Sequence, residues 1–378
     1  MIVGAGAIAP AHIEGFLNFP ERAEIRVIAN PTVVRARKLV EKYRLNAVVT
    51  ASFEEELASV DVVAVCSPPS SHRDIAVRAL EAGKHVLLEK PMAMSLEECD
   101  AIIEAAQRGG GKLSVVAQSR FISSIHNVIK IIRSGAYGKL LFAQINSFWW
   151  RGQNYYDLYW RGVWENEGGG CTLNHAVHHI DLLLWVKGLP KVVSACMGNV
   201  QHGNSEEEDL SMSSLMYPDG TMAQINSSLI HHGEEQKLDF QMEKAGISLP
   251  FAVHANVPRS NGFPSKDEEM QRKIQEEYKQ LPPLLYEHHA GQIDNFLRSI
   301  ETGAPPLIDG KEGRETIELI TAMYKSAITG GQVGLPLAED DLHYSFNGQI
   351  MEVVRFNTKK RSIDTFGDNA ITTFEGKF

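Results

Sequence analysis

Short apolar runs alternate with longer segments of helical periodicity along the first third of the chain. The runs have the length of buried strands and cover residues 1–3, 24–29, 60–67, 85–89 and 113–117. The segments between them carry apolar residues every three or four positions, over residues 10–19, 33–43, 72–82 and 95–108. Strands that alternate with helices in this way build a parallel sheet with both faces covered. Residues 1–118 are therefore predicted to form a doubly wound nucleotide-binding α/β domain.

Helical periodicity returns towards the end of the chain, over residues 287–302 and 312–329. The stretch 267–280 is polar and predicts an exposed helix or an insertion. Residues 206–209 are four consecutive acidic side chains. Because such side chains are rarely buried, they predict a charge run exposed to solvent.

The composition restricts the kinds of partner that this chain has. Its 378 residues are enough for two domains, or for one core with large additions. There are 37 Lys and Arg against 47 Asp and Glu, a net charge of −10, whereas proteins that bind nucleic acids or anionic membranes are normally basic. The four cysteines are widely spaced, and no apolar run has the length of a membrane helix. We expect a cytoplasmic protein with reduced thiols that binds neither nucleic acid nor a membrane.

The segment Gly4-Ala5-Gly6-Ala7-Ile8-Ala9 matches the dinucleotide-binding pattern G-x-G-x-x-G/A. Gly4 permits the tight turn, Gly6 lets the backbone approach a pyrophosphate, and Ala9 lets the helix pack closely on the strand. The N-terminus of that helix offers free N–H groups to the anion. Small residues also cluster in ordinary turns, but the position between an apolar start and a helix favours cofactor binding.

Asn30 stands at the end of the next predicted strand, where the pattern has an acidic residue that binds the adenosine ribose. Asparagine can bond to a hydroxyl without repelling a 2′-phosphate. Arg35 and Arg37 follow closely, although both suit a solvated helix face better. We predict NAD as the cofactor, and the sequence leaves NADP open.

Polar motifs stand at the ends of two further predicted strands, where ligands bind to a doubly wound sheet. Ser67-Pro68-Pro69, followed by His72, ends one strand, and Glu89-Lys90-Pro91 ends the next. An isolated Glu-Lys pair is more often a surface ion pair. Together, however, the two motifs form a specific pattern.

With these motifs the chain resembles the glucose-fructose oxidoreductase, inositol dehydrogenase and rhizopine-catabolism family (Gfo/Idh/MocA). The resemblance includes the segment from Gly168-Gly169-Gly170 to Asp181, and it continues through residues 292–298, 309–314 and 334–337. It implies a Rossmann domain over residues 1–118, followed by an α/β domain with a large, mostly antiparallel open sheet.

This second domain, residues 119–337, would bind the substrate, and its sheet would form the interface of a homo-oligomer, a dimer or a tetramer. Residues 338–378 extend beyond the resemblance, as an arm for a partner subunit or as a cover for the site.

The resemblance also implies site residues. The lysine of the family's E-K-P motif corresponds to Lys90, beside the nicotinamide and the reacting oxygen. In the motif G-G-G-x-x-x-D-x-x-x-H, His178 takes the position of the catalytic histidine, and Asn174 replaces the aspartate common in inositol dehydrogenases. The positions assigned to the cofactor are Gly4, Gly6, Ala7, Ile8, Ala9, Asn30, Ser67, Pro68, His72, Glu89, Lys90 and Gln118.

The expected chemistry also follows from the residue types. Moving a hydride from a carbinol carbon to a nicotinamide requires a base for the hydroxyl proton, and histidine is the usual base near neutrality. An ammonium group beside the same oxygen stabilises the developing alkoxide. His178 and Lys90 suit these roles. Asn174 lies one helical turn before His178 and shares its face if the segment is a helix.

Histidines concentrate around the predicted base, with His175, His178 and His179 close to Asp181. His175 and His179 have i, i+4 spacing, but a metal centre needs three or four ligands. We therefore predict no metal and assign His175 and His179 to the substrate site as hydrogen-bonding residues.

Aromatic residues concentrate between positions 148 and 164, interleaved with polar and charged side chains. This composition suits a carbohydrate pocket, while packing under a loop or in a subunit interface is the alternative for most of them. Trp160 and Arg161 are the predicted substrate-binding residues of this segment. Gln118 and Arg120, where the first domain ends, are predicted to line the same cleft.

The sequence thus predicts an NAD(P)-dependent oxidoreductase that acts on a ring secondary hydroxyl of a sugar or glycoside, with C3 favoured. One alternative is an NAD-dependent glycosidase that works by transient oxidation and elimination. The other is a non-catalytic ligand sensor, which would not need the pair Lys90 and His178.

Overall fold

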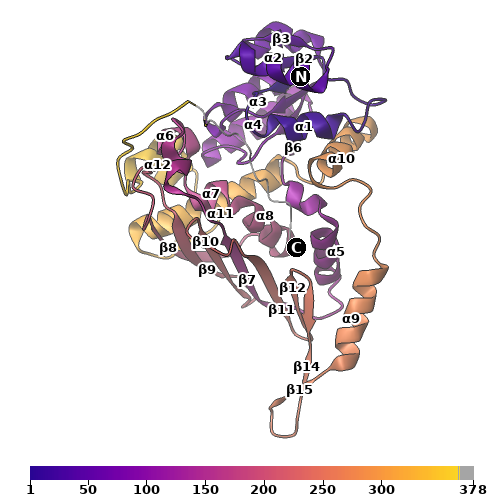
Figure 1. The fold of residues 1–378 in the computed structure, drawn as a ribbon. Helices are drawn as coiled ribbons and strands as arrows, with labels where there is room; N and C mark the ends of the chain where they lie inside the picture. The colour runs from indigo at the N-terminus through magenta and orange to yellow at the C-terminus, as the bar shows by residue number, and fades with distance from the viewer. Residues whose placement is uncertain (365, 367–378) are drawn as a thin grey trace.

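A computed structural model describes residues 1–364 and residue 366. Its N-terminal part is a six-stranded parallel sheet in the order β3-β2-β1-β4-β5-β6 (Figure 1). The order reverses beside β1, which is the switch point where ligands bind in such sheets. The strands are β1 (Ile2–Val3), β2 (Val27–Ala29), β3 (Val48–Thr50), β4 (Val62–Val65), β5 (His85–Leu88) and β6 (Leu113–Val115).

Alternate residues of these strands pack into two separate apolar clusters, because successive side chains point to opposite faces. Ile2 and Ile28 pack with the helices of one face, while Val3 and Val27 pack with those of the other. The helices of this part are α1 (Ala9–Phe16), α2 (Val33–Tyr43), α3 (His72–Glu81) and α4 (Leu96–Gly109), with 3-10 turns η1 (Phe53–Ser59), η2 (Pro69–Ser71) and η3 (Gln118–Phe121). The doubly wound fold predicted from the sequence is confirmed.

Strand β3 is absent from the sequence-based prediction. It has three residues at the sheet edge, and only Thr50 is buried. A strand this short and this exposed leaves no continuous apolar run, so periodicity alone does not show it.

The second sheet has eight strands in the order β13-β12-β11-β7-β10-β9-β8-β16. The β10–β7 pair is parallel, and the other pairs are antiparallel, in agreement with the predicted mostly antiparallel sheet. The strands are β7 (Leu140–Phe148), β8 (Val192–Gly198), β9 (Leu210–Met216), β10 (Met222–Ser228), β11 (Gln236–Met242), β12 (Gly246–Leu249), β13 (Ala252–His254) and β16 (Val333–Gly334).

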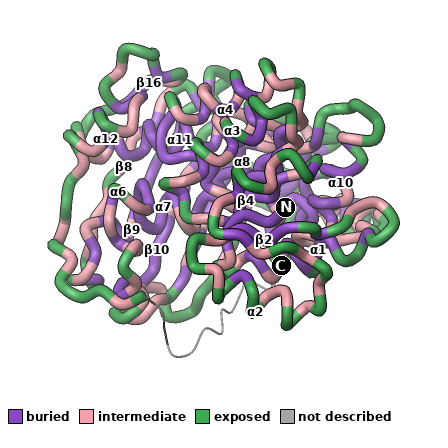
Figure 2. Tube along the Cα trace, turned by 90° about the horizontal axis from the view of Figure 1, so that it is seen from above, coloured by how far each residue is buried: buried purple, intermediate pink, exposed green. Residues whose placement is uncertain are grey.

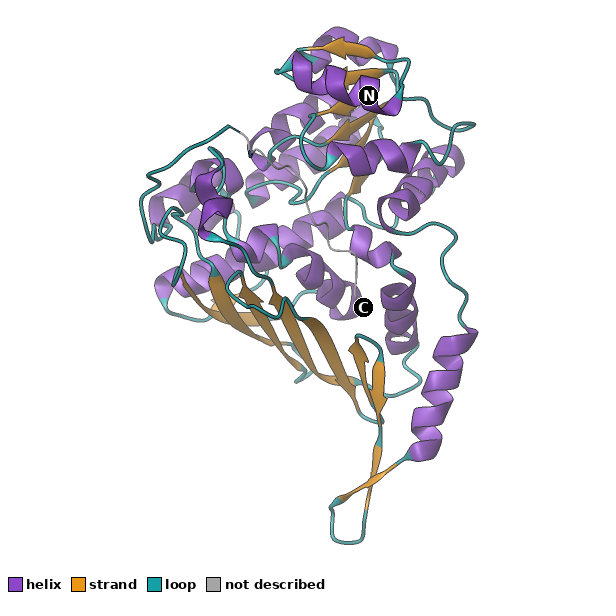
Figure 3. Cartoon of the chain, in the orientation of Figure 1, coloured by secondary structure: helices purple, strands orange, loops and turns teal. Residues whose placement is uncertain are grey.

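Helices cover one face of this sheet, and within the described part of the chain the opposite face carries none (Figure 3). The covering helices are α5 (Ser123–Arg133), α8 (Val177–Lys187) and α11 (Gly310–Thr329). On the open face, Met212, Met216, Met222 and Phe142 are each more than a third exposed. Exposed apolar side chains on a flat sheet are what a subunit interface needs, and the homo-oligomer stays a prediction.

The remaining elements lie around this two-sheet body. The hairpin β14 (Asn256–Pro258) and β15 (Pro264–Lys266) projects away from it, and the predicted polar helix is α9 (Glu268–Gln280) (Figure 1). Shorter helices are η4 (Gln153–Asp157), α6 (Trp164–Glu167), α7 (Cys171–Asn174), η5 (Leu342–Tyr344) and α12 (Phe346–Glu352). Within the part of the chain that the structure describes, no helix is long and apolar enough to cross a membrane.

Helix α10 (His288–Thr302) belongs to the later sequence but packs against α1. Its buried residues Ile293, Phe296 and Leu297 join the apolar cluster of the first sheet. Figure 2 shows buried positions along β2 and β4 and also along α8 and α11. The chain therefore returns to its first part after building the second sheet.

Candidate active site

The glycine turn after β1 has the geometry that a dinucleotide requires. Gly4 has a φ of +105°, and a Cβ there would lie 2.6 Å from the carbonyl oxygen of Cys66, so only glycine fits. Gly6 and Ala7 are exposed, and a Cβ at Gly6 would meet no atom within 4 Å. Helix α1 begins at Ala9 without a side-chain cap, and its N-terminus points to this turn as the positive end of the helix dipole. The N–H of Ala9 bonds to the carbonyl of Gly6, and Pro10 has no N–H. The turn therefore fits a pyrophosphate.

Asn30 supports this turn directly. Its Oδ1 accepts a hydrogen bond of 3.0 Å from the N–H of Ala5, and its Nδ2 donates to the carbonyl of Thr32. Arg35 and Arg37 are exposed on α2, as the sequence predicts. Asn30 thus connects the ends of β1 and β2 at the place assigned to the adenosine ribose.

His72 is fully buried between the two strand-end motifs. Its ring nitrogens lie 2.8 Å from the carbonyl oxygen of Pro91 and 2.9 Å from that of Ser67. Burial lowers the pKa of His72. The assignment of this side chain to cofactor binding is therefore corrected, because His72 holds the Ser67-Pro68 and Lys90-Pro91 loops together from within.

Glu89 is the centre of a group that the sequence analysis missed. His12 on α1 bonds to its carboxylate over 2.7 Å, His289 on α10 lies 3.5 Å from it, and the N–H of Lys90 donates to it. Burial opposes ionisation of Glu89, but the bonds from His12 and His289 outweigh it and hold the pKa of Glu89 well below its usual range. Glu89 therefore fixes the backbone of Lys90 through the bond that it accepts from the Lys90 N–H.

His12, Glu89 and His289 also bring their ligand atoms within 4.8 Å of one another. The 2.7 Å separation of His12 Nε2 and Glu89 Oε1 is a hydrogen-bond distance. Hydrogen bonding to Glu89 therefore explains why these three side chains lie together. The position of His12, three residues after the G-x-G-x-x-A pattern, could have indicated that it lies near the site. No residue near His289 in the sequence indicates that His289 contacts Glu89.

Lys90 extends from the end of β5 to the second part of the chain. Its Nζ donates a hydrogen bond of 3.1 Å to the backbone carbonyl of Asn174. Burial lowers the pKa of Lys90, and the charge of Glu89 partly offsets this. The structure thus brings the two predicted motifs, Glu89-Lys90-Pro91 and Gly168 to Asp181, into direct contact.

The segment that carries Asn174 and His178 is not one continuous helix. Helix α7 ends at Asn174, α8 begins at Val177, and the side-chain Nδ2 of Asn174 donates to the carbonyl of Gly169. His178 stands in the first turn of α8 and is partly exposed. Burial, followed by the charge of Lys90, holds the pKa of His178 well below its usual value, so the imidazole is neutral at pH 7 and available as a base.

The predicted solvated charge run 206–209 is wrong, because Glu207, Glu208 and Asp209 are fully buried. The carboxylate of Glu208 accepts bonds from the N–H groups of Gly170 and Thr172, at 3.0 and 2.9 Å. Consecutive acidic residues usually lie in solvent, but free N–H groups at the start of α7 provide the partners that bury Glu208. The run therefore supports the glycine triplet.

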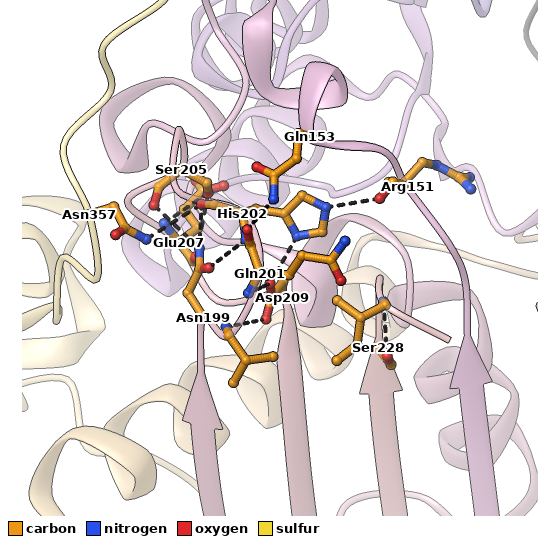
Figure 4. Close-up of polar contacts among 12 residues, drawn as sticks. Arg151, Gln153, Asn199, Gln201, His202, Ser205, Glu207, Asp209, Ser228 and Asn357 are labelled. Carbon is orange, nitrogen blue, oxygen red and sulfur yellow. Dashed lines mark hydrogen bonds and ion pairs between the residues drawn. The ribbon is translucent and has the colours of Figure 1, made fainter. Parts of the chain in front are cut away.

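Asp209 closes the loop that precedes β9 (Figure 4). It lies 2.9 Å from His202 Nδ1 and accepts bonds from the N–H groups of Val200 and Gln201. The other ring nitrogen of His202 lies 2.9 Å from the carbonyl of Arg151. This network connects the loop to the aromatic segment that follows β7.

The two flanking histidines have different surroundings. His175 is partly exposed, its Nε2 lies 3.4 Å from Tyr155 Oη, and burial and nearby positive charges hold its pKa well below the usual value. His179 is 2% exposed, and its Nδ1 lies 2.8 Å from Ser147 Oγ on β7. His175 therefore remains a candidate for the substrate site. The assignment of His179 to that site is corrected, because its ring connects α8 to the second sheet.

Burial of the histidines predicts a fall in stability at acid pH. Burial lowers the pKa of His179 from 6.5 to about 4. Between pH 6.5 and pH 4, His179 is therefore protonated in the unfolded chain but stays neutral in the folded chain. The free energy of unfolding should therefore decrease as the pH falls from 6.5 towards 4. Urea titrations across this range should show a shallower decrease for His179→Gln, whereas the exposed His254→Gln should match the wild type. Equal slopes in all three proteins would contradict the assignment.

Arg120 is not available to a substrate, which corrects another assignment. Its side chain is 2% exposed, bonds to both carboxylate oxygens of Asp181 at 2.7 and 2.8 Å, and bonds to Glu312 at 2.6 Å. It therefore ties η3 to α8 and α11. Gln118 differs, because its Oε1 is buried, has no hydrogen-bond partner among the described residues and so remains available to a ligand.

Arg161 and Trp160 lie together on the aromatic segment. The Arg161 guanidinium stacks 4.2 Å from the ring centroids of Trp160 and Tyr155, and it bonds to Glu167 at 3.0 Å. Trp149 and Trp164 are buried and pack in the interior, while Trp150 is 40% exposed. Packing thus explains part of the aromatic cluster, and Trp160 and Arg161 remain candidates for the substrate.

The chain after α12 crosses this aromatic segment, and we call residues 353–363 the C-terminal strap. The N–H of Ile363 bonds to the carbonyl of Asp157, and that of Phe356 bonds to the carbonyl of Glu206. Lys359 Nζ donates to the carbonyls of Tyr156 and Arg161. The described part of the predicted C-terminal extension therefore lies over the loop that carries Trp160 and Arg161.

Removing the Lys359 bonds should loosen this loop. We expect Lys359→Met to raise KM for the substrate by about 3- to 10-fold with little change in kcat, the size expected for lost charged hydrogen bonds. Lys360→Met is the matched control, because this neighbouring side chain is exposed. Hydrogen exchange of residues 155–163 should rise in the first variant alone. Unchanged exchange and unchanged KM would show that the strap does not position the loop.

Comparisons with known proteins agree with this geometry. The model of the Gfo/Idh/MocA oxidoreductase family, NAD-binding Rossmann fold, matches residues 1–117, and that of the family's C-terminal alpha/beta domain matches residues 129–335. D-glucoside 3-dehydrogenase of Escherichia coli is 25% identical over 355 residues, 88% of this chain and 96% of that protein. Myo-inositol 2-dehydrogenase of Thermotoga maritima is 24% identical over 331 residues, 86% and 95% of the two chains.

A solved structure is similar over almost the same extent. The WlbA dehydrogenase from Bordetella pertussis, in complex with NADH and UDP-GlcNAcA, has 27% sequence identity and a TM-score of 0.75. The match covers 89% of this chain and 98% of that one. With both family models matched in order and an NAD-binding Rossmann fold among them, the chain belongs to the Gfo/Idh/MocA family of oxidoreductases.

Proposed function

We propose that this chain oxidises a ring secondary hydroxyl of a sugar or glycoside, C3 being favoured, with NAD, and reduces the ketone in the reverse direction. The observation that carries the proposal is the bond from Lys90 Nζ to the carbonyl of Asn174, which joins the cofactor domain to the motif with His178. This bond supports the proposal because it brings Lys90 to the segment that carries His178, and the charge of Lys90 acts on the His178 ring.

The residues divide the chemistry between them. Bound NAD would accept the hydride from the carbinol carbon. His178, neutral because of burial, takes the hydroxyl proton on its imidazole. The Lys90 ammonium stabilises the negative charge that develops on the oxygen. Asn174 supplies no charge and acts by fixing the glycine triplet.

The substrate class rests on the aromatic segment and on the relatives. Trp160 presents a partly exposed ring beside Arg161, an arrangement suited to a sugar ring and its hydroxyls. The matched relatives are named as a D-glucoside 3-dehydrogenase and a myo-inositol 2-dehydrogenase, which act on ring hydroxyls. For the cofactor we propose NAD, because Asn30 bonds to Ala5 and Thr32 and to no arginine of the described residues, and the exposed Arg35 and Arg37 leave NADP to be tested.

The test begins with purification without added nucleotide and identification of any retained cofactor by mass spectrometry. A panel of free sugars, methyl glycosides and inositols is then followed at 340 nm with NAD and with NADP, and products are analysed. We expect stoichiometric NADH and a keto sugar from at least one ring alcohol. No absorbance change and no keto product with any member of the panel would contradict the proposal.

A redox-neutral reaction is the second candidate, because one relative is named for a different outcome. The 2,7-anhydro-N-acetylneuraminate hydratase of Escherichia coli is 25% identical over 269 residues, 69% of this chain. An enzyme of this kind, like the NAD-dependent glycosidase considered from sequence, would consume substrate with no net change at 340 nm. Product analysis in the same panel separates the two functions.

A further inference from the structure

The Lys90 ammonium needs a counter-ion in its surroundings. Burial disfavours its charged form, and its hydrogen bond goes to a neutral acceptor, the backbone carbonyl of Asn174. A buried ammonium without a counter-ion loses its proton more easily. The proposed oxidation needs that proton, since a neutral amine would not stabilise a developing alkoxide. A carboxylate close to Lys90 therefore has a task in the reaction.

Three charged groups act on Lys90 from different elements. Arg161 opposes its ammonium and Glu167 favours it, but these two side chains bond to each other at 3.0 Å, so their effects largely cancel. The third group is Glu89, whose charge makes the largest contribution in favour of the ammonium. The counter-ion of Lys90 is therefore Glu89, its neighbour in the sequence.

Glu89 is itself 4% exposed, so it needs donors inside the protein to stay ionised. Its Oε1 lies 2.7 Å from Nε2 of His12 on α1 and 3.5 Å from Nε2 of His289 on α10. Its Oε2 accepts a bond of 3.1 Å from the N–H of Lys90. Burial raises the pKa of Glu89, but the two histidines outweigh burial and hold this pKa well below its usual range.

The charge of Glu89 also acts on three side chains of the elements packed around it. These are Cys66 after β4, His72 on α3 and His178 on α8. Burial raises the pKa of the thiol and lowers the pKa of both imidazoles, so all three groups are uncharged at pH 7. Lys90 is therefore the cation that Glu89 stabilises.

We propose that His12 and His289 are positioning residues for the oxidation: they hold Glu89 ionised beside Lys90, and Lys90 thereby keeps its proton. His12 follows the glycine turn, whereas His289 comes from the helix with which the later sequence returns to the first sheet. Because their role is to fix a charge, their loss should change the pH range of activity more than the affinity for the sugar. The inference rests on the proposed function.

Glu89→Gln removes the charge and keeps an acceptor for the N–H of Lys90. We expect the alkaline limb of the kcat profile to move to lower pH by about 1 to 3 pH units, the effect of losing a nearby opposite charge. His289→Phe should move it less, because the bond from His12 remains. His289→Gln keeps an N–H donor and should restore the limb. His288→Asn is the matched control, because asparagine tolerates the φ of +52° at this neighbouring position.

The pH profile separates this role from a structural one. A structural defect would lower kcat at every pH and leave the alkaline limb in place. In the double variant, Glu89→Gln with His289→Phe, the limb should lie where Glu89→Gln alone puts it, because His289 acts through Glu89. An unmoved limb in a folded Glu89→Gln protein would overturn the proposal, and so would a further displacement in the double variant.

Competitive labelling with acetic anhydride measures the charge of Lys90 without turnover. The reagent acetylates neutral amines, and mass spectrometry of peptides gives the labelled fraction of each lysine as the pH is raised. Lys90 should be labelled at a lower pH in Glu89→Gln and in His289→Phe than in the wild type, while Lys84 should not change. Because no sugar is needed, this result distinguishes failure of the counter-ion role from failure of the proposed oxidation. If Glu89→Gln does not fold, equal labelling of Lys90 in His289→Phe and the wild type would overturn the proposal.

Discussion

Lys90→Met is expected to lower kcat by about 10²- to 10³-fold, the range for removing one group that stabilises a developing oxyanion. The Lys90 ammonium bonds to the Asn174 carbonyl at 3.1 Å, and no other basic side chain of the described residues makes this bond between the two motifs. Methionine has a similar shape, so the fold and cofactor binding should persist. Single-turnover rates at 340 nm, with cofactor affinity measured by fluorescence titration, check both expectations.

The partner variant His178→Asn should reduce kcat by about 10²- to 10⁴-fold, as expected for loss of a general base. The double variant should be little slower than the worse single one, because residues that act on one step are not additive. Lys84→Met is the control, since this lysine belongs to the same β5 motif but precedes the strand. Rates like the wild type in either catalytic variant would exclude that residue from the mechanism.

Arg120→Met is expected to destabilise the protein by about 3–5 kcal/mol, because it leaves the buried carboxylate of Asp181 without its partner. The reason is the position of the guanidinium, which is 2% exposed and bonded to Asp181 and Glu312. Urea midpoints read by tryptophan fluorescence would measure the loss. The exposed Arg298→Met serves as the matched control, with a surface ion pair to Asp294.

The double variant Arg120→Met with Asp181→Asn should recover part of this loss, because it removes the unpaired charge together with its partner. Equal urea midpoints for Arg298→Met and Arg120→Met would show that the buried ion pairs of Arg120 contribute nothing to stability. A loss of sugar affinity without a loss of stability would instead restore the original assignment of Arg120 to the substrate.

Local patterns predicted the elements of the first sheet well. Its strands are buried on both faces and appear as continuous apolar runs, and its helices follow the 3.6-residue period. Helix α2 spans Val33–Tyr43, the predicted residues, and α3 differs from its predicted range by one residue. The glycine turn was equally readable, because the φ of +105° at Gly4 excludes other residues.

The roles of polar residues whose partners lie far away in the sequence were much harder to predict. His72 and His179 stood beside motifs and were assigned to ligands, yet their rings bond within the fold to Pro91 and Ser147. Glu207 and Glu208 were predicted to be exposed, because charged side chains usually are and the sequence does not show which groups they bond to. His289 lies 200 positions after Glu89 in the sequence, and no local spacing connects the two.

The sequence by itself determined the doubly wound domain, the glycine turn and the family, because each is encoded by residues close together along the chain. The roles of Lys90 and His178 stay a prediction. Only the tertiary structure decided which polar groups are used up inside the protein and which remain available to a ligand. A carboxylate or an imidazole has the same local sequence whether its partner is a helix N-terminus, a buried arginine or a substrate. The long-range contacts of Glu208 and Arg120 make that distinction.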